Sequence, residues 1–300
     1  MQVECFNDFE IKNLTTFKIG GKVAKVYFPK NVDEFVFVLE SEPFAKVVGN
    51  LSNTLVSTSG YNGVVISTSK MKSFKIEQNL LTADAGIKGP FLAKQAAENG
   101  LSGIEFMIGF PGSVGGEVCM NASANGQSIS NCVKKVKLYS SENGVFVLSK
   151  DEMEFSYRNS ICQKMPYIVL SAEFELTPAP REEIGKRMQD NLNFRKNHQP
   201  SLVLPNCGSV FKNPNGDSAG RLLELAGAKE LQIGGARVWE NHANFIVNDR
   251  AGTSEDVLNL MFDMYSMVKN KFGIELEPEV RFLGGNNENE VKLCKILYRN

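Results

Sequence analysis

Apolar and polar positions along this chain alternate between short strand-like runs and helix-like runs, a pattern that indicates an α+β protein. Strands are expected at residues 23–29, 46–48, 64–67, 80–85, 133–139, 145–148, 168–176 and 245–247. Helices are expected at residues 31–39, 89–99, 181–196, 218–226 and 253–272. The last of these has the clearest amphipathic spacing, and Gly273 ends it.

Residues 274–283 alternate strictly, and the sequence predicts one strand with two unlike faces. The apolar face holds Ile274, Leu276, Val280 and Phe282, and the polar face holds Glu275, Glu277, Glu279 and Arg281. Carboxylates on such a face are usually solvated, whereas a buried one beside a guanidinium would be a tuned acid or base. The segment that follows is rich in Asn and Glu at 286–290, and we expect it to be mobile.

Composition narrows the class of protein. A chain of 300 residues predicts two or three domains, and 33 basic against 34 acidic residues argue against a nucleic-acid or membrane-surface protein. Six cysteines without a C-x-x-C pair fit a reduced cytoplasmic protein, and two histidines leave no basis for a metal site. No run of 18 apolar residues and no signal peptide occurs, so we expect a cytoplasmic location.

Two glycine-rich segments are candidates for phosphate binding, because such turns can aim backbone N–H groups at an anion. The first is Gly49-Asn-Leu-Ser-Asn53, which follows a strand, and the second is Pro111-Gly-Ser-Val-Gly-Gly116. Neither matches a standard nucleotide-binding fingerprint. Each could equally be an ordinary tight loop.

Four further side chains could carry chemistry. Arg158 follows Tyr157 and would lie on the opposite face of any strand there, and Ser209 follows a glycine just before an Asn-Pro turn. His242 and Glu279 are possible acid–base groups. The alternative is structural in every case: a surface ion pair, a turn serine, a hydrogen-bonding histidine and a solvated carboxylate.

Taken together and in this order, the motifs resemble those of the UDP-N-acetylenolpyruvoylglucosamine reductase (MurB) family of bacterial cell-wall synthesis. The resemblance runs from Asn13 to about Gly284. It rests on the segments 13–21, 49–53, 85–89, 111–116, 157–158, 208–214, 242–248 and 276–281.

The resemblance implies a two-lobed FAD-binding region of the vanillyl-alcohol-oxidase type, followed by a C-terminal α+β substrate domain. We place the lobes at 1–72 and 73–190 and the substrate domain at 191–300. By resemblance, FAD would be held by Gly49, Asn50, Ser52, Asn53, Gly86, Pro111, Gly112, Ser113, Gly115 and Gly116.

The resemblance also implies the reaction: NADPH reduces FAD, which then reduces the enolpyruvyl ether of a UDP-linked amino sugar to a lactyl ether. Arg158, and Glu279 if it is protonated or bridged, would stabilise charge on the substrate carboxylate, and Ser209 would donate the proton. The substrate contacts would be Tyr157, Asn213, His242, Arg195 and Lys196. We expect a monomer that binds this small molecule and neither nucleic acid nor membrane.

The sequence departs from the family pattern in three places. The family's flavin loop usually has more glycine than Gly49-Asn-Leu-Ser-Asn53, and although Asn50 tolerates a positive φ, Leu51 does so only with strain. Ser113 replaces the usual threonine and keeps the hydroxyl. Only residues 161–166 separate Ser160 from Tyr167, so the tyrosine-bearing insertion of some relatives is absent and the chain resembles the shorter subclass.

Three other functions remain open at this stage. An oxidase of the same flavin fold would not need NADPH. A non-catalytic nucleotide-sugar binder would keep the glycine loops without needing the serine, arginine and glutamate. A cysteine hydrolase would use Cys207 with His198 or His242, although no orienting motif supports it.

Overall fold

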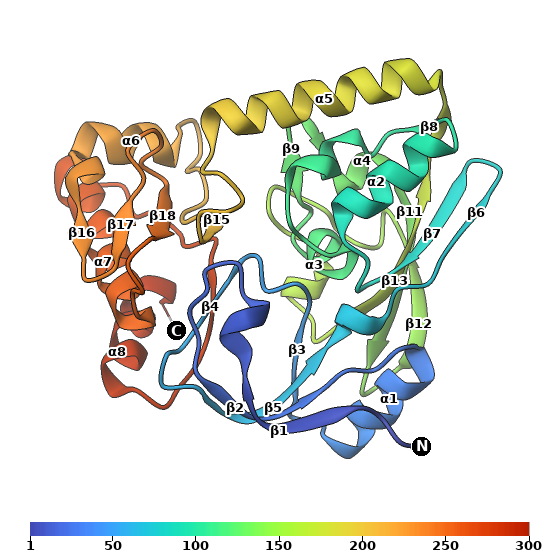
Figure 1. Ribbon diagram of the computed structural model, residues 1–300, viewed down its shortest axis with the longest axis horizontal. Helices are drawn as coiled ribbons and strands as arrows, with labels where there is room; N and C mark the ends of the chain where they lie inside the picture. Colours follow the sequence, from blue (N-terminus) through green and yellow to red (C-terminus); the bar gives the residue numbers. More distant parts are fainter. Residues whose placement is uncertain (300) are drawn as a thin grey trace. The chain divides into compact units, whose positions relative to one another are not determined.

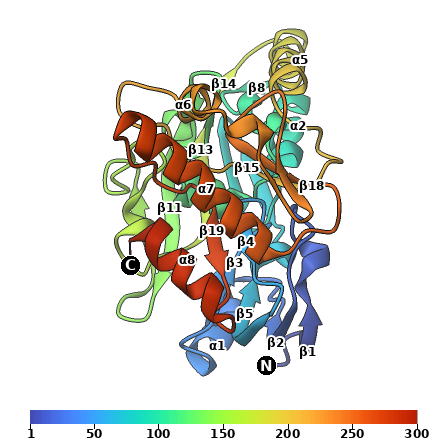
Figure 2. The same cartoon turned by 90° about the vertical axis from the view of Figure 1, so that its left-hand side faces the viewer.

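The computed structural model describes residues 1–299, which fold into two compact units that are each built from separated segments (Figures 1 and 2). Unit 1 comprises residues 1–6, 26–50 and 64–195, and unit 2 comprises residues 7–25, 51–63 and those from 196 onward. The chain passes between the units inside β1 (Cys5–Glu10), β2 (Lys22–Tyr27), β5 (Tyr61–Ser67) and α5 (Arg181–His198). The division at residues 72 and 190 therefore stays a prediction.

Unit 1 is built on an antiparallel sheet with the strand order β12-β11-β13-β7-β6. Its strands are β6 (Phe74–Glu77), β7 (Leu80–Asp84), β11 (Val133–Ser140), β12 (Gly144–Ser149) and β13 (Ile168–Glu175). The helices α2 (Gly89–Glu98), α3 (Val114–Cys119) and α4 (Ile129–Cys132) contribute to the apolar core of this sheet. Short pairs join β8 (Leu101–Ser102) to β14 (Thr177–Pro178) and β9 (Ser123–Ala124) to β10 (Gln127–Ser128).

The remaining sheet that involves unit 1 has the order β1-β2-β5-β3, with β3 (Lys46–Val48) parallel to β5. α1 (Val32–Ser41) begins as predicted, because the Asn31 side chain accepts a hydrogen bond from the N–H of Glu34. Its buried side chains Phe35 and Val38 pack with Ile66 and Leu170 in a second, smaller core. This arrangement places the first glycine-rich segment at the end of β3.

Unit 2 packs a four-stranded sheet, ordered β15-β18-β17-β16, against helices (Figure 2). The strands are β15 (Asn206–Ser209), β16 (Gln232–Ile233), β17 (Ala236–Val238) and β18 (Phe245–Asn248). The helices are α6 (Ala219–Ala226), α7 (Ser254–Phe272) and α8 (Glu288–Tyr298). The apolar stripe predicted on α7 is buried in this core, which confirms the spacing argument. None of the helices among residues 1–299 is long and apolar enough to cross a membrane.

The segment 274–283 is extended, but only part of it is a strand. β19 (Arg281–Leu283) pairs in parallel with β4 (Thr54–Val56), while residues before it make a single bridge, Phe211 to Pro278. The predicted alternation holds in burial, because Leu276 and Val280 are 1% exposed and Glu277 between them is exposed. The prediction of one continuous strand is wrong because a proline at 278 cannot donate to a ladder.

The C-terminal segment is a docked helix, which corrects the expectation of a mobile tail. Asn287 caps α8, which lies beside α7 (Figure 2). Glu290 on α8 is 1% exposed, and its carboxylate accepts hydrogen bonds from the hydroxyls of Ser57 (2.6 Å) and Ser254. The Asn and Glu that suggest disorder in sequence therefore act as a cap and a buried acceptor.

Replacing Glu290 by Ala should destabilise unit 2, because two buried hydroxyls lose their acceptor. An unsatisfied buried polar group costs about 1–3 kcal/mol. The free energy of unfolding, measured with denaturant, should fall by that amount or more. Glu288→Ala is the matched control, because Glu288 lies on the exposed side of the same helical turn. Equal stabilities of the two variants would contradict this account of the C-terminal helix.

Candidate active site

The two glycine-rich segments meet in unit 1. The Asn50 side-chain amide donates to the carbonyl of Pro111, and the Ser113 hydroxyl lies where a side chain on Gly49 would begin. The Ser113 hydroxyl is buried and has no hydrogen-bond partner among the described residues. A buried hydroxyl without a partner is costly, so this corner of the fold is suited to a ligand that offers an acceptor.

Glycine is required at two positions of the second glycine-rich segment, because neighbouring backbone or side-chain atoms leave no room there for a Cβ. A Cβ on Gly115 would lie 2.9 Å from Ala85 Cβ, and one on Gly112 would lie 2.5 Å from the Glu117 carboxyl. Gly116, by contrast, is exposed, with only the Ser113 hydroxyl nearby at 3.8 Å. The segment therefore combines a closely packed inner side with an accessible backbone, which suits contact with a phosphate.

Gly86 has a different environment from the one expected for a ligand contact. It is buried, and a Cβ there would collide with the Thr68 carbonyl and lie 2.7 Å from the Met71 carbonyl. Glycine at this position lets the chain pack against itself. The structure thus favours a packing role for Gly86.

The remainder of the first segment belongs to unit 2. Leu51 adopts a φ of +48° with its side chain buried, so the strain expected from the missing glycine falls on this leucine. The Asn53 side-chain amide donates to the Glu279 carbonyl (3.0 Å), and the Arg281 N–H donates to the Asn53 carbonyl (2.9 Å). Asn53 therefore holds the chain at Glu279. Ser52 contributes its carbonyl to a long contact with the Thr16 hydroxyl (3.5 Å).

Arg158 lies in a tight turn of unit 1 instead of a strand. Residues 156 and 159 bridge each other, and Arg158 has a φ of +53°. Its guanidinium lies 5.4 Å from the Tyr157 ring centroid, so the two side chains share one side of the turn. Its Nη1 donates to the Ser123 hydroxyl (2.7 Å) on β9, which follows α3 and the second glycine segment. These contacts hold a partly buried cation in a defined orientation.

Ser209 and Glu279, seventy residues apart in sequence, lie on adjacent extended segments of unit 2. Ser209 ends β15, and the next residue accepts a hydrogen bond from the Glu279 N–H at 2.8 Å through the carbonyl of Val210. The Lys212 N–H likewise donates to the Glu277 carbonyl (2.8 Å). The structure thus pairs the backbone segments that carry Ser209 and Glu279, two residues that the sequence suggested separately.

Asn244 is a positioning residue that the sequence analysis did not single out. Its side chain is 3% exposed and bonds both the N–H (2.9 Å) and the carbonyl (2.8 Å) of Phe211, while its own carbonyl accepts from the Val210 N–H (2.9 Å). Asn244 therefore fixes the two residues after Ser209. The available signal was a buried-strand pattern at 243–247 interrupted by one amide side chain.

Asn213 and His242 both contact α6. The Asn213 side-chain carbonyl accepts from the Ala219 N–H (3.0 Å), and the His242 ring packs against Gly220. His242 Nδ1 accepts from the Asn244 N–H (3.2 Å), and burial lowers the pKa of the imidazole. A neutral ring with Nδ1 occupied has one donor left, Nε2–H, so His242 is suited to orientation more than to proton transfer.

The two cations predicted before the serine motif differ in environment. Arg195 is partly buried on α5, with its side chain 3.9 Å from where a Cβ on Gly109 would lie, and burial lowers its pKa. Lys196 is exposed and belongs to unit 2. Arg195 therefore lies near the start of the second glycine segment.

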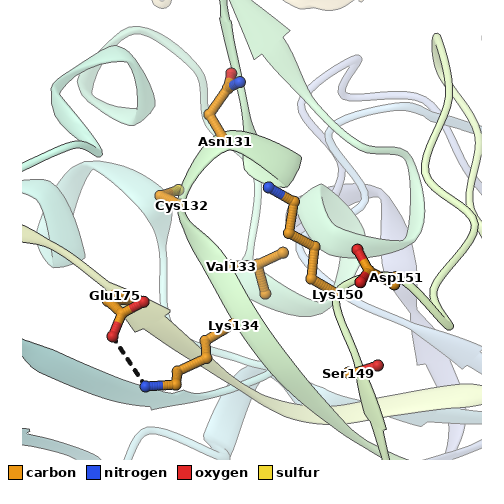
Figure 3. Close-up of a pocket in the computed structure, with 8 residues that line it drawn as sticks. All are labelled: Asn131, Cys132, Val133, Lys134, Ser149, Lys150, Asp151 and Glu175. Atoms are coloured by element: carbon orange, nitrogen blue, oxygen red, sulfur yellow. Dashed lines mark hydrogen bonds and ion pairs between the residues drawn. The ribbon is translucent and has the colours of Figure 1, made fainter.

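A surface pocket of about 290 Å³ opens elsewhere in unit 1 and contains none of the predicted site residues (Figure 3). Its walls include Lys134, Lys150 and Glu175, and Lys134 and Glu175 pair across 2.9 Å. Paired surface charges of this kind contribute little and show no convergence on a ligand. No group of metal-ligating side chains occurs anywhere in residues 1–299.

Comparison with known proteins places this geometry in a defined class. A family model for an FAD binding domain matches residues 24–148, and one for the UDP-N-acetylenolpyruvoylglucosamine reductase C-terminal domain matches residues 199–283. The chain is thus an FAD-dependent oxidoreductase of α+β class with a C-terminal domain after its flavin-binding region, as the sequence predicts.

The relatives fix the family. The chain is 40% identical over 289 residues to the UDP-N-acetylenolpyruvoylglucosamine reductase of Caldicellulosiruptor saccharolyticus, covering 95% of this chain and 93% of the relative. The corresponding protein of Lactobacillus helveticus is 40% identical over 278 residues, covering 91% and 93%. The crystal structure of the Thermus caldophilus enzyme (MurB) superposes with a TM-score of 0.80 at 32% identity, covering 94% of this chain and 99% of that one. The chain belongs to the UDP-N-acetylenolpyruvoylglucosamine reductase family.

Proposed function

We propose that this chain reduces the enolpyruvyl ether of UDP-N-acetylglucosamine enolpyruvate to UDP-N-acetylmuramate with NADPH, a step in peptidoglycan precursor synthesis. The observation that carries the proposal is the pairing of the two segments that bear Ser209 and Glu279, held by the hydrogen bond from the Glu279 N–H to the Val210 carbonyl. A binder that performs no chemistry has no need to pair the two segments that supply a hydroxyl and a carboxylate.

The residues of the glycine segments fit a flavin nucleotide. The buried Ser113 hydroxyl without a partner and the accessible backbone at Gly116 support binding of its phosphates, with Gly49, Asn50 and Gly112 shaping the turns. Pro111 accepts the Asn50 amide and so joins the two turns. When bound, FAD would relay hydride from NADPH to the enolpyruvyl group.

The reacting carbon atoms define what the side chains must do. Hydride addition to the terminal vinyl carbon leaves negative charge on the neighbouring carbon and its carboxylate. A fixed cation and donated hydrogen bonds stabilise such charge, and Arg158, oriented by Ser123, supplies them. Ser209 donates a proton to that carbon, which produces the lactyl ether. Glu279, when protonated or bridged, contributes a donated hydrogen bond to the same developing charge.

The substrate's other groups require further contacts. We assign Tyr157, Asn213 and His242 to the sugar and enolpyruvyl portions, and Arg195 and Lys196 to the diphosphate. Tyr157 is 53% exposed and Asn213 is exposed, so both could reach a ligand without rearrangement of the core. Gly115, Ser52 and Asn53 remain assigned to the flavin side, Asn53 through its backbone because its amide holds Glu279.

The chemistry of Cys207 argues against a cysteine hydrolase. Cys207 is 2% exposed, and burial, reinforced by the charge of Glu279, raises the pKa of its thiol well above the usual range. A thiol that stays protonated and buried is a poor nucleophile. An oxidase remains distinguishable by experiment, since it would reoxidise with oxygen and ignore NADPH.

The proposed activity also implies a cellular location and an oligomeric state. UDP-sugars and NADPH are cytosolic small molecules, and we propose a cytoplasmic monomer that contacts neither membrane nor nucleic acid. The near-zero net charge supports this. Size-exclusion chromatography with light scattering at several protein concentrations would test the monomer.

The purified protein should be yellow, and acid release should yield FAD and not FMN. NADPH should bleach the flavin absorbance, and the enolpyruvyl nucleotide should restore it under anaerobic conditions while UDP-N-acetylmuramate forms. NADH serves as the control for nucleotide choice. A colourless protein that takes up no added FAD would overturn the proposed function, and bleaching that only oxygen reverses would support the oxidase instead.

A further inference from the structure

Glu117 is the least expected side chain next to the flavin segments. It lies on α3, directly after the second glycine segment, and is 3% exposed. Neither of its carboxyl oxygens has a hydrogen-bond partner among the described residues. A carboxyl buried in this way would be strongly destabilising if it were ionised.

The neighbouring glycines explain how the carboxyl fits. A Cβ on Gly112 would lie 2.5 Å from Glu117 Oε1, and a Cβ on Gly89 would lie 2.8 Å from Oε2. The Gly89 N–H also donates to the Gly112 carbonyl (3.2 Å), and Lys88 bridges Ser113. The carboxyl therefore fills the junction between the turn before α2 and the glycine segment that we assign to the flavin phosphates.

We propose that Glu117 is a positioning residue for FAD and that its carboxyl must remain protonated for FAD to bind tightly. The proposal rests on the proposed flavin-binding function. A neutral carboxyl completes the packing over Gly89 and Gly112. An ionised one places an unpaired negative charge beside the segment that receives an anionic diphosphate, which weakens FAD binding through the low-dielectric interior.

Linkage gives the direction of the effect. Burial raises the pKa of Glu117 well above its usual value, and a bound diphosphate raises it further. FAD and the proton then favour each other reciprocally. Between the pKa of the free form and that of the FAD-bound form, the dissociation constant for FAD should rise with pH by up to about tenfold per unit.

The other titratable groups around α3 do not account for such a dependence of FAD binding on pH. On α4, burial raises the pKa of the Cys132 thiol to about 12, with a smaller contribution from the charge of Glu117, so the thiol stays neutral. Asp84 on β7 accepts from the Ser73 N–H, and Glu173 on β13 pairs with Lys135 at 3.2 Å, so both carboxylates have partners away from α3.

The remaining titratable groups lie near the two sides of the junction between the turn before α2 and the second glycine-rich segment. Lys88 before α2 is exposed, and so is Lys94 on α2. Cys162, in the short helix after Arg158, has a raised pKa because of the neighbouring Cys119 thiol and burial, and it also stays neutral. None of these groups contributes to the shift of Glu117, which burial causes.

The test compares three variants by diluting the FAD-loaded protein between pH 6 and 9.5 and measuring released FAD by its fluorescence. Glu117→Gln keeps the shape without an ionisable proton, so it should bind FAD like the parent at pH 6 and show no weakening at higher pH. Glu117→Ala leaves a cavity over Gly89 and Gly112 and should bind more weakly at every pH. Glu105→Gln is the matched control. Glu105 is equally buried but fully hydrogen-bonded to Ser102, Gly103 and Arg187, which lowers its pKa.

A second readout does not depend on FAD. Because the folded protein binds the Glu117 proton more tightly than the unfolded chain, the apoprotein should lose stability as the pH rises, and Glu117→Gln should lose less. A parent profile that is flat to pH 9.5, or a Gln variant that follows the parent, would overturn the proposal. A parent that binds no FAD would instead remove the proposed function itself.

Discussion

Replacing Ser209 by Ala should reduce turnover by about 10²–10⁴-fold, the range ascribed to general acid catalysis, while leaving flavin reduction by NADPH near normal. The hydroxyl is small and lies at the end of β15, where Asn244 fixes the next two residues through the backbone. The fold and flavin binding should therefore survive its loss. Proton donation to the substrate carbon is needed only in the second half-reaction.

Stopped-flow measurement of both half-reactions, together with product stereochemistry, tests the role of Ser209. Ser209→Cys should recover part of the rate because a thiol also donates a proton, and Ser201→Ala provides a control at an exposed serine of the same unit. Without a positioned acid, water protonates either face and the lactyl centre should be partly scrambled. An alanine variant that turns over like the parent would assign the proton to bound water instead. The buried Cys207 is unsuited to that role because its thiol is inaccessible.

Arg158→Ala and Glu279→Gln should each slow substrate reduction by about 10²–10³-fold, the typical cost of losing one preorganised electrostatic contact. Charge develops on the substrate carboxylate only after hydride addition, so reduction of the flavin by NADPH should be little affected. Arg158 is oriented by Ser123 and Tyr157, and the backbone at Glu279 is held by Asn53 and Val210, so both residues are fixed in place before substrate arrives.

Matched variants separate this effect from general damage. Glu277→Gln removes a carboxylate two residues from Glu279 that is exposed and paired with Lys212, and it should behave like the parent. Arg181→Ala removes an exposed cation at the start of α5. If Arg158→Ala or Glu279→Gln slowed both half-reactions equally, the flavin site would be damaged and the assignment to the substrate carboxylate would be wrong.

The part of the candidate site in unit 2 depends on contacts between residues far apart in the chain, which no local sequence pattern reveals. Ser209 and Glu279 belong to separate motifs, and only the pairing of residues 277–280 with 210–212 brings their segments side by side. Asn53 appeared in a glycine segment and was assigned to the flavin, yet its side chain holds the chain at Glu279. No sequence pattern pointed to Glu117, because a single glutamate in a short helix is expected to lie at the surface. Its burial is visible only in the three-dimensional structure.

Local chemistry determined much of the secondary structure. The α1 and α7 helices begin where their caps place them, and α7 also ends at the predicted Gly273, because those signals lie within a few residues of each other. α1 continues to Ser41, two residues beyond its predicted end. The strands β7, β11, β12 and β13 of the central sheet of unit 1 also agree with their apolar runs, whereas β6 was not predicted. The ordered series of motifs identified the family. Such features need only neighbours in sequence.

Tertiary structure decided the rest. The segment 286–290 is polar in sequence, but Asn287 caps α8 and Glu290 meets two hydroxyls from residues 57 and 254, so a helix forms where mobility was expected. In the first glycine-rich segment, Leu51 combines a positive φ with a buried side chain, so the backbone strain falls on this residue. Sequence alone determined the local elements and the chemistry available to them. Which polar groups are buried, and which partner each one finds, follows only from long-range packing, because desolvation and hydrogen bonding depend on residues far away in the chain.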